Sequence, residues 1–242
     1  MAKGLPDFRP LYAQVASLLT ERIGSGQWKP GAPLPSEIEL AEELKVSQGT
    51  VRKALGEMEA RNLLVRQQGR GTFVAQHSAE ATLFRFFPLV DAAGAKPVPT
   101  SIVLAQKTGR AERREAAALA LAPRSLVHRI LRLRRIAGRT VVVERITLSA
   151  ALFAGLALPI GTEIHEELYV IYEQQFGITV VRADEELRAV PAAAADARHL
   201  GLAPGTPLLE VRRIARDLYG APVELRIDRC DTSGHCYANT LT

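Results

Sequence analysis

A short polar segment in the first quarter of the chain carries side chains that suit contact with DNA. Arg52 can donate two hydrogen bonds to the O6 and N7 edge of guanine, and Gln48 can read an adenine edge. Ser47, Thr50 and Lys53, with the backbone N–H groups of a helix start, suit phosphate oxygens. The candidate DNA-binding residues of this segment are therefore Ser47, Gln48, Gly49, Thr50, Arg52 and Lys53. Among them we expect Arg52 to contribute most to sequence discrimination.

A second candidate contact lies at the tip of a predicted hairpin. The sequence LLVRQQGRGTFVA places alternating apolar residues on both sides of Gln68, Gly69, Arg70 and Gly71, a pattern typical of two strands joined by a tight turn. The two glycines permit the positive φ that such a tip needs. Arg70 has no acidic neighbour and can enter a minor groove or meet a phosphate. We therefore predict a small wing whose tip, formed by these four residues, contacts DNA.

Three helices are predicted to position these residues. The first begins after Pro10, and its apolar face is formed by Leu11, Val15, Leu18, Leu19 and Ile23. Ser36 and Glu39 have the spacing of a capping box, which predicts a short helix over residues 36–44 and adds Ser36 to the candidate DNA contacts. Ser47 is suited to cap the third helix, whose inward face holds Val51, Ala54, Leu55 and Met58. Two short helices, a tight turn and a wing form a winged helix-turn-helix.

The rest of the chain mixes strands with a few helices and contains an internal echo. Residues 119–138 resemble residues 200–220, and each copy reads as a helix, a Leu-Ala-Pro corner, a strand and a glycine turn. Each copy then returns through a further strand, which carries Glu144 in the first copy and Glu224 in the second. Two such hairpins favour an antiparallel sheet.

The chain has 242 residues, a length that allows two domains. The segment AQHSAEAT, residues 75–82, interrupts the apolar periodicity and predicts the boundary between them. We therefore expect an α+β protein with a winged helix-turn-helix over residues 8–76, a linker over 77–83 and a sheet-containing domain over 84–242.

Buried arginines are predicted in the strand LVHRILRLRR. Alternation along this strand places His128, Arg132 and Arg134 on one face, where arginines are costly unless an anion or a carboxylate meets them. In one interpretation they bind an anionic ligand, and in the other they form cross-strand ion pairs with Glu144. Residues 105–139 hold ten Lys or Arg against two Glu, an excess that fits either an anion-binding cleft or a solvated basic face.

Composition excludes some classes of protein. A chain with 47% hydrophobic and 24% charged residues is globular, and a net charge of +5 is too mild to identify a partner. Two cysteines exclude a disulfide framework, and without a signal peptide or a membrane-spanning stretch we expect the protein in the cytoplasm. Cys230, His235 and Cys236 lack a fourth ligand nearby, so structural roles are favoured over a metal site, and no cofactor is predicted.

The DNA-binding domain of GntR-type regulators resembles residues 11–75 almost from end to end, over LYAQVASLLTERIGSGQWKPGAPLPSEIELAEELKVSQGTVRKALGEMEARNLLVRQQGRGTFVA. The resemblance implies dimers on short pseudo-palindromic operators in double-stranded DNA, with bases read by Gln48, Thr50, Arg52 and the wing. Many members carry arginine, as a DNA contact, between the two glutamates of the second helix, where this chain has Ile38. Its operator preference is therefore expected to differ from theirs.

The UTRA ligand-sensing domain of the HutC branch resembles the rest of the chain, notably in TSIVLAQK, RLRRIAGRTVVVERITL, ELYVIYEQQFGI and APVELRIDRC. The resemblance implies a chorismate lyase-like antiparallel sheet with an effector cleft between sheet and helices. The candidate effector contacts are Arg132, Arg134, Glu144, Glu167, Tyr169, Glu224, Arg226 and Tyr237. Phosphosugar sensors of this branch usually have serine where this chain has Glu167, a residue that repels phosphate. We therefore predict a phosphate-free effector that carries a carboxylate.

These patterns together predict a homodimeric repressor whose operator affinity falls when a small-molecule effector binds to the second domain. One alternative is a lyase-like enzyme, although no serine-histidine-acid or metal constellation supports catalysis. Another is a ligand-binding module joined to a protein-interaction domain, in which Arg52 and Lys53 are only solvated. We expect a regulator and not an enzyme.

Overall fold

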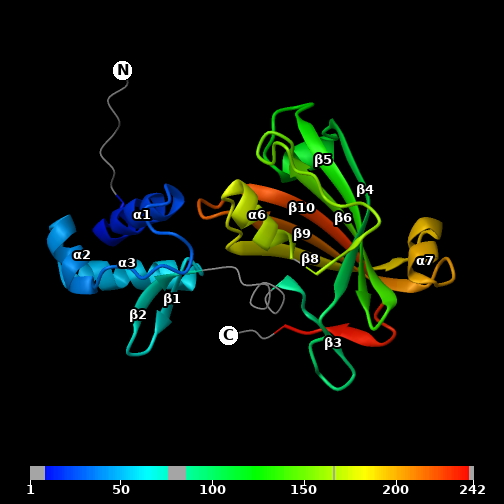
Figure 1. Cartoon of the computed structure of the whole chain (residues 1–242), viewed down its shortest axis with the longest axis horizontal. Helices are drawn as coiled ribbons and strands as arrows, with labels where there is room; N and C mark the ends of the chain where they lie inside the picture. The colour runs from blue at the N-terminus through cyan, green and yellow to red at the C-terminus, as the bar shows by residue number, and fades with distance from the viewer. Residues whose placement is uncertain (1–8, 76–85, 166, 240–242) are drawn as a thin grey trace. The chain divides into compact units, whose positions relative to one another are not determined.

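The computed structural model describes residues 9–75, 86–165 and 167–239. The chain divides into two compact units, residues 1–76 and 77–242 (Figure 1). Helices dominate the first unit and strands dominate the second, which is the predicted α+β arrangement. The predicted linker, residues 77–83, lies outside the described residues.

Over residues 9–75 the first unit consists of three helices and an antiparallel hairpin: α1 (Leu11–Gly24), α2 (Glu37–Leu44), α3 (Gln48–Ala60), β1 (Leu64–Gln67) and β2 (Gly71–Val74). The predicted inward face of α3 is confirmed, because its four apolar residues are all buried. The prediction for α1 is wrong at Leu11 and Leu18, which are exposed. A helix turns by about 100° per residue, and the buried stripe of α1 is centred on Ala16, Leu19 and Ile23, so both leucines lie on its flank.

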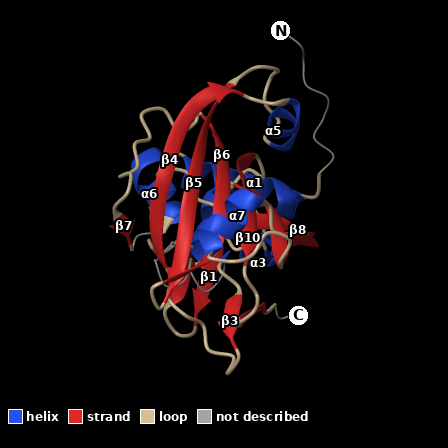
Figure 2. Ribbon diagram, turned by 90° about the vertical axis from the view of Figure 1, so that its right-hand side faces the viewer, coloured by secondary structure: helices blue, strands red, loops and turns tan. Residues whose placement is uncertain are grey.

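The second unit is built on a sheet of seven strands in the order β7-β4-β5-β6-β10-β9-β8, in which all neighbours are antiparallel. Figure 2 shows β4, β5 and β6 as long curved strands side by side. The strands of this sheet are β4 (Thr100–Arg110), β5 (Leu126–Ile136), β6 (Arg139–Ser149), β7 (Glu163–Ile164), β8 (Arg182–Pro191), β9 (Pro207–Arg216) and β10 (Pro222–Cys230). The helices in the described part of the unit are α5 (Arg113–Ala118), α6 (Leu168–Phe176) and α7 (Ala194–Leu200).

The internal echo corresponds to a repeated topology. The order strand, helix, strand, strand occurs as β4-α5-β5-β6 and again as β8-α7-β9-β10. Both predicted hairpins are present, and their returning strands β6 and β10 pair with each other at the centre of the sheet. Glu144 and Glu224 therefore lie on adjacent central strands.

Side-chain alternation gives the sheet two faces with separate cores. On the first face Ile130, Ile146 and Leu148 pack against Tyr169 and Tyr172 of α6. On the second face the apolar residues of β5, β6 and β9 pack against α7. A two-stranded ribbon of β3 (Leu89–Asp91) and β11 (His235–Tyr237) packs beside the first face, where Leu89 joins a cluster with Val142, Val211 and Cys230.

Candidate DNA-binding surface and effector site

Two serines fix the starts of α2 and α3. The Ser36 backbone N–H donates to Glu39 Oε2 at 2.8 Å, and the Glu39 N–H donates to Ser36 Oγ at 3.2 Å, so the predicted capping box is present. Ser47 Oγ accepts from the Thr50 N–H at 3.1 Å and caps α3. Lys45 adopts a left-handed conformation, with φ of 53°, that ends α2 and makes the turn tight. These local bonds produce the predicted helix-turn-helix.

The N-terminal part of α3 presents the predicted base-reading side chains to solvent. Gln48, Gly49 and Arg52 are exposed, and Thr50 is half-buried. Arg52 Nε donates to Glu37 Oε2 at 2.9 Å, and Gln48 Nε2 donates to the same oxygen at 3.4 Å. Glu37, the first residue of α2, thus accepts hydrogen bonds from both residues that are predicted to read bases. Sequence reasoning missed Glu37, because the contact depends on how α2 crosses α3.

Lys53 is exposed on α3, but its ammonium group lies 4.0 Å from the centre of the Tyr12 ring of α1. The contact has the geometry of a cation–π interaction. This contact holds the side chain of Lys53, the predicted phosphate-binding lysine, against the first helix. Contact of Lys53 with phosphate stays a prediction.

The wing ends in a tight turn formed by the predicted tip residues. Gly69 and Gly71 have φ of +72° and +108°, and the Arg70 N–H donates to the Gln67 carbonyl at 2.9 Å. Gln68 and Arg70 are exposed at this tip. The hairpin geometry is confirmed, whereas contact of its tip with DNA stays a prediction.

The position that carries arginine in many GntR members is apolar and exposed here. Ile38 is 58% exposed on α2, one residue after Glu37. Its neighbour Glu39 is used by the capping box. The surface beside the reading helix therefore lacks the cation that the GntR resemblance leads us to expect at this position.

In the second unit, most of the predicted effector residues meet in a buried charged layer on the first face of the sheet. Arg132, Glu144, Glu224 and Arg226 are each less than 5% exposed, although all four are ionisable. Their strands β5, β6 and β10 are neighbours, so the side chains form a row across the sheet. Burial on this scale requires partners.

Arg132 pairs with Glu144, its cross-strand neighbour. Arg226 Nη1 lies 3.3 Å from the second oxygen of the same carboxylate. Burial acts to raise the pKa of Glu144, but the charges of Arg132, Arg226 and Arg134 outweigh it and lower the pKa to about 2. Only Nε of Arg132 is used, because its two terminal nitrogens have no hydrogen-bond partner among the described residues.

Arg134 pairs with Glu167, 33 residues away, and not directly with Glu144. Its terminal nitrogens donate to the two Glu167 oxygens at 2.9 and 2.7 Å. Glu167 is the residue that precedes α6, so a carboxylate occupies the start of this helix. The Arg134 guanidinium also lies 4.5 Å from the centre of the Phe87 ring. The predicted cross-strand ion pair with Glu144 is therefore present for Arg132, whereas it is wrong for Arg134, whose partner is Glu167.

Glu224 is the most completely satisfied carboxylate of the layer. It accepts from Tyr169 at 2.9 Å and Tyr172 at 2.8 Å, and Arg226 donates two bonds of 2.9 Å to it. Burial opposes its ionisation, yet Arg226 and the two hydroxyl groups keep its pKa below the ordinary range. The predicted residues Tyr169, Glu224 and Arg226 are therefore brought together, and they tie α6 to the sheet.

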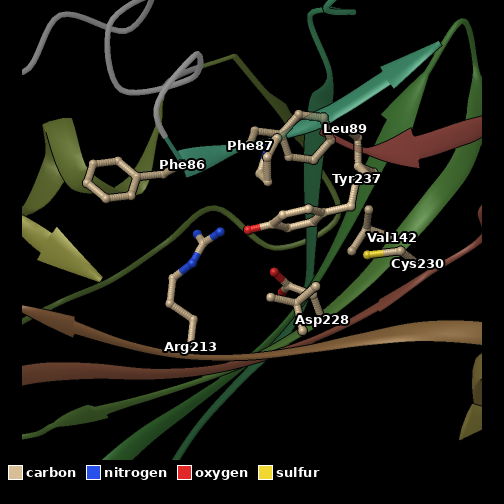
Figure 3. A pocket seen from close by; sticks show the side chains of 10 residues that line it. Phe86, Phe87, Leu89, Val142, Arg213, Asp228, Cys230 and Tyr237 are labelled. Carbon is tan, nitrogen blue, oxygen red and sulfur yellow. The ribbon is translucent and has the colours of Figure 1, made fainter. Parts of the chain in front are cut away.

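Sequence reasoning missed three polar residues of the same face, Arg213, Asp228 and Glu185. Arg213 Nε donates to Glu185 Oε1 at 2.6 Å, and the Tyr237 hydroxyl donates to the other Glu185 oxygen. Period-two alternation along β10 from Glu224 and Arg226 reaches Asp228 and could have found it. Arg213 and Asp228 line a small hollow, with room for about one water molecule, together with Phe87 and Tyr237 (Figure 3).

The two cysteines differ in environment, since Cys230 is buried and Cys236 is exposed. Within residues 9–75, 86–165 and 167–239, no group of three or more His, Cys, Asp or Glu side chains is arranged to hold a metal ion. Over the same ranges, none of the helices has the length and apolar character to cross a membrane.

Comparison with known proteins places both units. Residues 11–74 match the family described as bacterial regulatory proteins, gntR family, and residues 95–235 match the UTRA domain. The chain is 29% identical over 205 residues to the HTH-type transcriptional repressor NagR of Bacillus subtilis, covering 84% of this chain and 83% of that protein. It is 42% identical over 87 residues to the histidine utilization repressor of Pseudomonas putida, covering 36% of this chain and 35% of that protein.

A solved structure supports the assignment of the second unit. The ligand-binding domain of a GntR-family transcriptional regulator from Bordetella bronchiseptica has a TM-score of 0.61 and 33% identity, covering 64% of this chain and 96% of that domain. The winged helix-turn-helix and the sheet with its buried charged layer are thus the two modules of one kind of protein. The chain belongs to the GntR family of bacterial regulatory proteins, as a ligand-responsive DNA-binding transcription regulator of the HutC type with a UTRA domain.

Proposed function

We propose that this protein is a homodimeric repressor that acts in the cytoplasm and leaves its operator when a phosphate-free effector with a carboxylate binds to the UTRA domain. The carboxylate of the effector is inferred from Arg132. This side chain is fully buried, and both of its terminal guanidinium nitrogens lack a partner among the described residues. Unsatisfied buried donors are costly, and a carboxylate supplies two acceptors in matching geometry. The site is therefore suited to a ligand carboxylate.

Glu167 argues against a phosphate at the same place. A helix start attracts anions, but here the carboxylate of Glu167 occupies the start of α6 and accepts both terminal nitrogens of Arg134. A phosphate would have to displace this ion pair and approach a like charge. The arrangement favours an effector without phosphate.

The DNA-binding part of the proposal rests on α3 and the wing. Gln48 and Arg52 are exposed at the start of α3, and both serine caps hold the helix-turn-helix in place. Regulators with this motif read two half-sites related by a two-fold axis, which requires a dimer. Two relatives are named repressors, which supports repression as the mode of action.

Effector binding would act by favouring one conformation of the dimer over another. A ligand shifts such an equilibrium only by its difference in affinity for the two states. Ordering of the charged layer around Arg132 is one such difference, because a ligand supplies acceptors to donors that have no partner among the described residues. The state with weaker operator affinity is proposed to be the one that holds the ligand.

A mobility-shift assay with the gene's own upstream DNA tests the reading helix. Arg52→Ala should weaken binding to the operator by roughly 5- to 160-fold at constant salt, the equivalent of about 1–3 kcal/mol. Arg61→Ala is the matched control, since Arg61 is an exposed arginine at the C-terminal end of the same helix. Equal losses in the two variants would show that Arg52 contributes only charge.

Thermal unfolding and calorimetry with carboxylates, amino acids and sugar phosphates test the effector class. The proposal expects a carboxylate to stabilise the protein, to reduce operator binding and to lose both effects in Arg132→Gln. Tight binding of a sugar phosphate would contradict the role given to Glu167. Glu163→Gln serves as the control, because Glu163 is an exposed carboxylate of the same domain, on the edge strand β7.

A further inference from the structure

The seven-stranded sheet ends in one long strand, β8, that is paired along one side. In the strand order β8 stands last and pairs with β9 over residues 182–191 (Figure 1). Over the ranges that the structure describes, no further strand pairs with its outer edge. The opposite end of the sheet is closed by β7, which has two residues. The outer backbone groups of β8 therefore form a template for another strand.

The middle of β8 is exposed on both faces of the sheet. Glu186, Leu187, Arg188 and Ala189 are consecutive and all exposed, and successive side chains of a strand point to opposite faces. The strand has no lysine, its one proline is the last residue, and it pairs with β9 without a bulge. Lysines, internal prolines and bulges are the usual means by which an edge avoids pairing with another chain. This edge is therefore open to association.

The order of charges along β8 favours a second copy of the same strand as its partner. Two antiparallel copies related by a two-fold axis at Leu187 place Glu186 opposite Arg188 of the partner subunit, and Arg188 opposite the partner's Glu186. An axis at Glu186 would bring two carboxylates together, and an axis at Arg188 would bring two guanidinium groups together. Of these three registers, the one centred on Leu187 pairs opposite charges without opposing like charges.

The ion pairs that these residues form within one chain leave them available. Arg188 Nη2 lies 3.3 Å from Glu186 Oε2, and the two side chains are 65% and 54% exposed. An ion pair that is exposed to this degree holds its side chains only weakly. Both side chains can therefore turn toward a neighbouring strand.

The position of Leu187 also suits a two-fold axis. Its side chain is 45% exposed, and its neighbour on β9 is Val211, which belongs to the buried apolar cluster on the first face of the sheet. Two copies of Leu187 that meet at the axis would cover each other and extend this cluster across the boundary between subunits. Removal of exposed apolar surface from water favours such a contact.

We propose that β8 pairs with β8 of a second copy of this chain, antiparallel and with Leu187 at the two-fold axis, so that two seven-stranded sheets form one continuous sheet. The inference rests on the homodimer of the proposed function and names the surface that forms it. A two-fold axis uses the same patch on both subunits, and the pattern of β8 is complementary to itself. The same symmetry relates the two half-sites that a helix-turn-helix dimer reads.

Sedimentation equilibrium of the full-length protein at constant low salt tests the charge pairs. Arg188→Glu and Glu186→Arg each create two like-charge pairs across the axis, and each should raise the dimer dissociation constant by about tenfold or more. A mixture of the two variants restores opposite charges and should form a heterodimer of about wild-type affinity. Arg182→Glu is the matched control and should leave the constant unchanged. Arg182 is also exposed and paired with an acid two residues away, but in this register it lies opposite the uncharged Ala192.

A disulfide tests the register directly. Opposite Cα atoms of paired antiparallel strands lie about 4.5–5.5 Å apart, which is within the range that a disulfide spans. Cys236→Ser first removes the exposed cysteine. In that background Leu187→Cys should form a cross-linked dimer under mild oxidation, and Arg182→Cys, far from the axis, should not.

The outcomes separate this inference from the function on which it rests. A wild-type protein that stays monomeric, both alone and on operator DNA, overturns the homodimer and the inference with it. A wild-type dimer that survives both charge variants overturns the β8 interface and leaves the homodimer standing. The same holds if mixing the two variants fails to restore association, or if Leu187→Cys forms no cross-linked dimer.

Discussion

Glu37 offers a test of how the reading helix is positioned. Its carboxylate holds Arg52 through Nε at 2.9 Å, which leaves both terminal nitrogens of Arg52 free for an end-on pair of bonds to guanine. Glu37→Gln removes the charge and keeps the size of the side chain. Arg52 then loses an ion pair that fixes its direction, but it keeps every atom that is predicted to contact DNA.

The expected magnitude follows from the exposure of the pair. The side chain of Arg52 is 61% exposed and that of Glu37 is 21% exposed, so the pair is worth about 0.2–1 kcal/mol after solvent screening. Discrimination at the base pair read by Arg52 should therefore fall by roughly 1.4- to 5-fold in Glu37→Gln. Binding to unrelated DNA should strengthen, because a carboxylate leaves a surface that faces phosphates.

The assay compares binding of each protein to the operator and to single-base variants of it at constant salt. Arg52→Ala first identifies the base pair at which discrimination is lost. Glu37→Gln should then show a smaller loss at that same base pair, and Glu42→Gln, an exposed carboxylate elsewhere on α2, should show none. A uniform change across all base pairs in Glu37→Gln would mean that Glu37 contributes only charge, and the positioning argument would be wrong.

Three further predictions concern other parts of the molecule. Ile38→Arg adds a cation beside the reading helix, and the slope of log affinity against log salt should steepen by about one in a titration with operator DNA. Glu167→Ser should free Arg134 and the start of α6, so calorimetry should detect binding of inorganic phosphate that wild type lacks. The folded-state pKa of Asp228, about 7, exceeds its ordinary value of 3.8, so ionisation of Asp228 destabilises the fold increasingly as pH rises between these values. Asp228→Asn should therefore raise the melting temperature relative to wild type at pH 8 and change it little at pH 4, and an equal difference at both would contradict the buried acid.

The first unit could be predicted almost completely because its determinants are local. Ser36 with Glu39 and Ser47 with Thr50 act over three residues, and the glycines of the wing act within one turn. The exception is Glu37, whose contact with Arg52 spans 15 residues and two helices. Neither the capping residues nor the apolar periodicity predicts the angle at which α2 crosses α3.

The partners in the charged layer could not be predicted in the same way. Alternation correctly placed Arg132 and Arg134 on one buried face, but the partner of Arg134 is Glu167, which comes from the start of α6. Strand order also matters, because Arg213 and Glu185 meet only when β8 pairs with β9. A single sequence specifies which side chains face inward more readily than which ones meet.

The internal echo shows a further limit of sequence patterns. The motif Arg-Arg-Ile-Ala occurs at residues 134–137 and 212–215, which would make Arg134 equivalent to Arg212. In the structure the inward arginine of the second copy is instead Arg213. The register of β5 shifts between Arg134 and Arg135, and a shift of one residue moves the following side chains to the other face. The two copies share a topology but not an identical arrangement of charges.

The internal pairing of the layer changes what an effector has to supply. Each buried arginine already has a carboxylate partner, in the pairs Arg132–Glu144, Arg134–Glu167, Arg213–Glu185 and Arg226–Glu224. A ligand therefore gains most by supplying acceptors to the terminal nitrogens of Arg132, which have no partner among the described residues. Buried hydrogen bonds are weakly screened by salt, whereas contacts with DNA phosphates are strongly screened. Effector affinity should thus vary far less with ionic strength than operator affinity, and a steep salt dependence of effector binding would place the ligand on the exposed basic surface instead of in the layer.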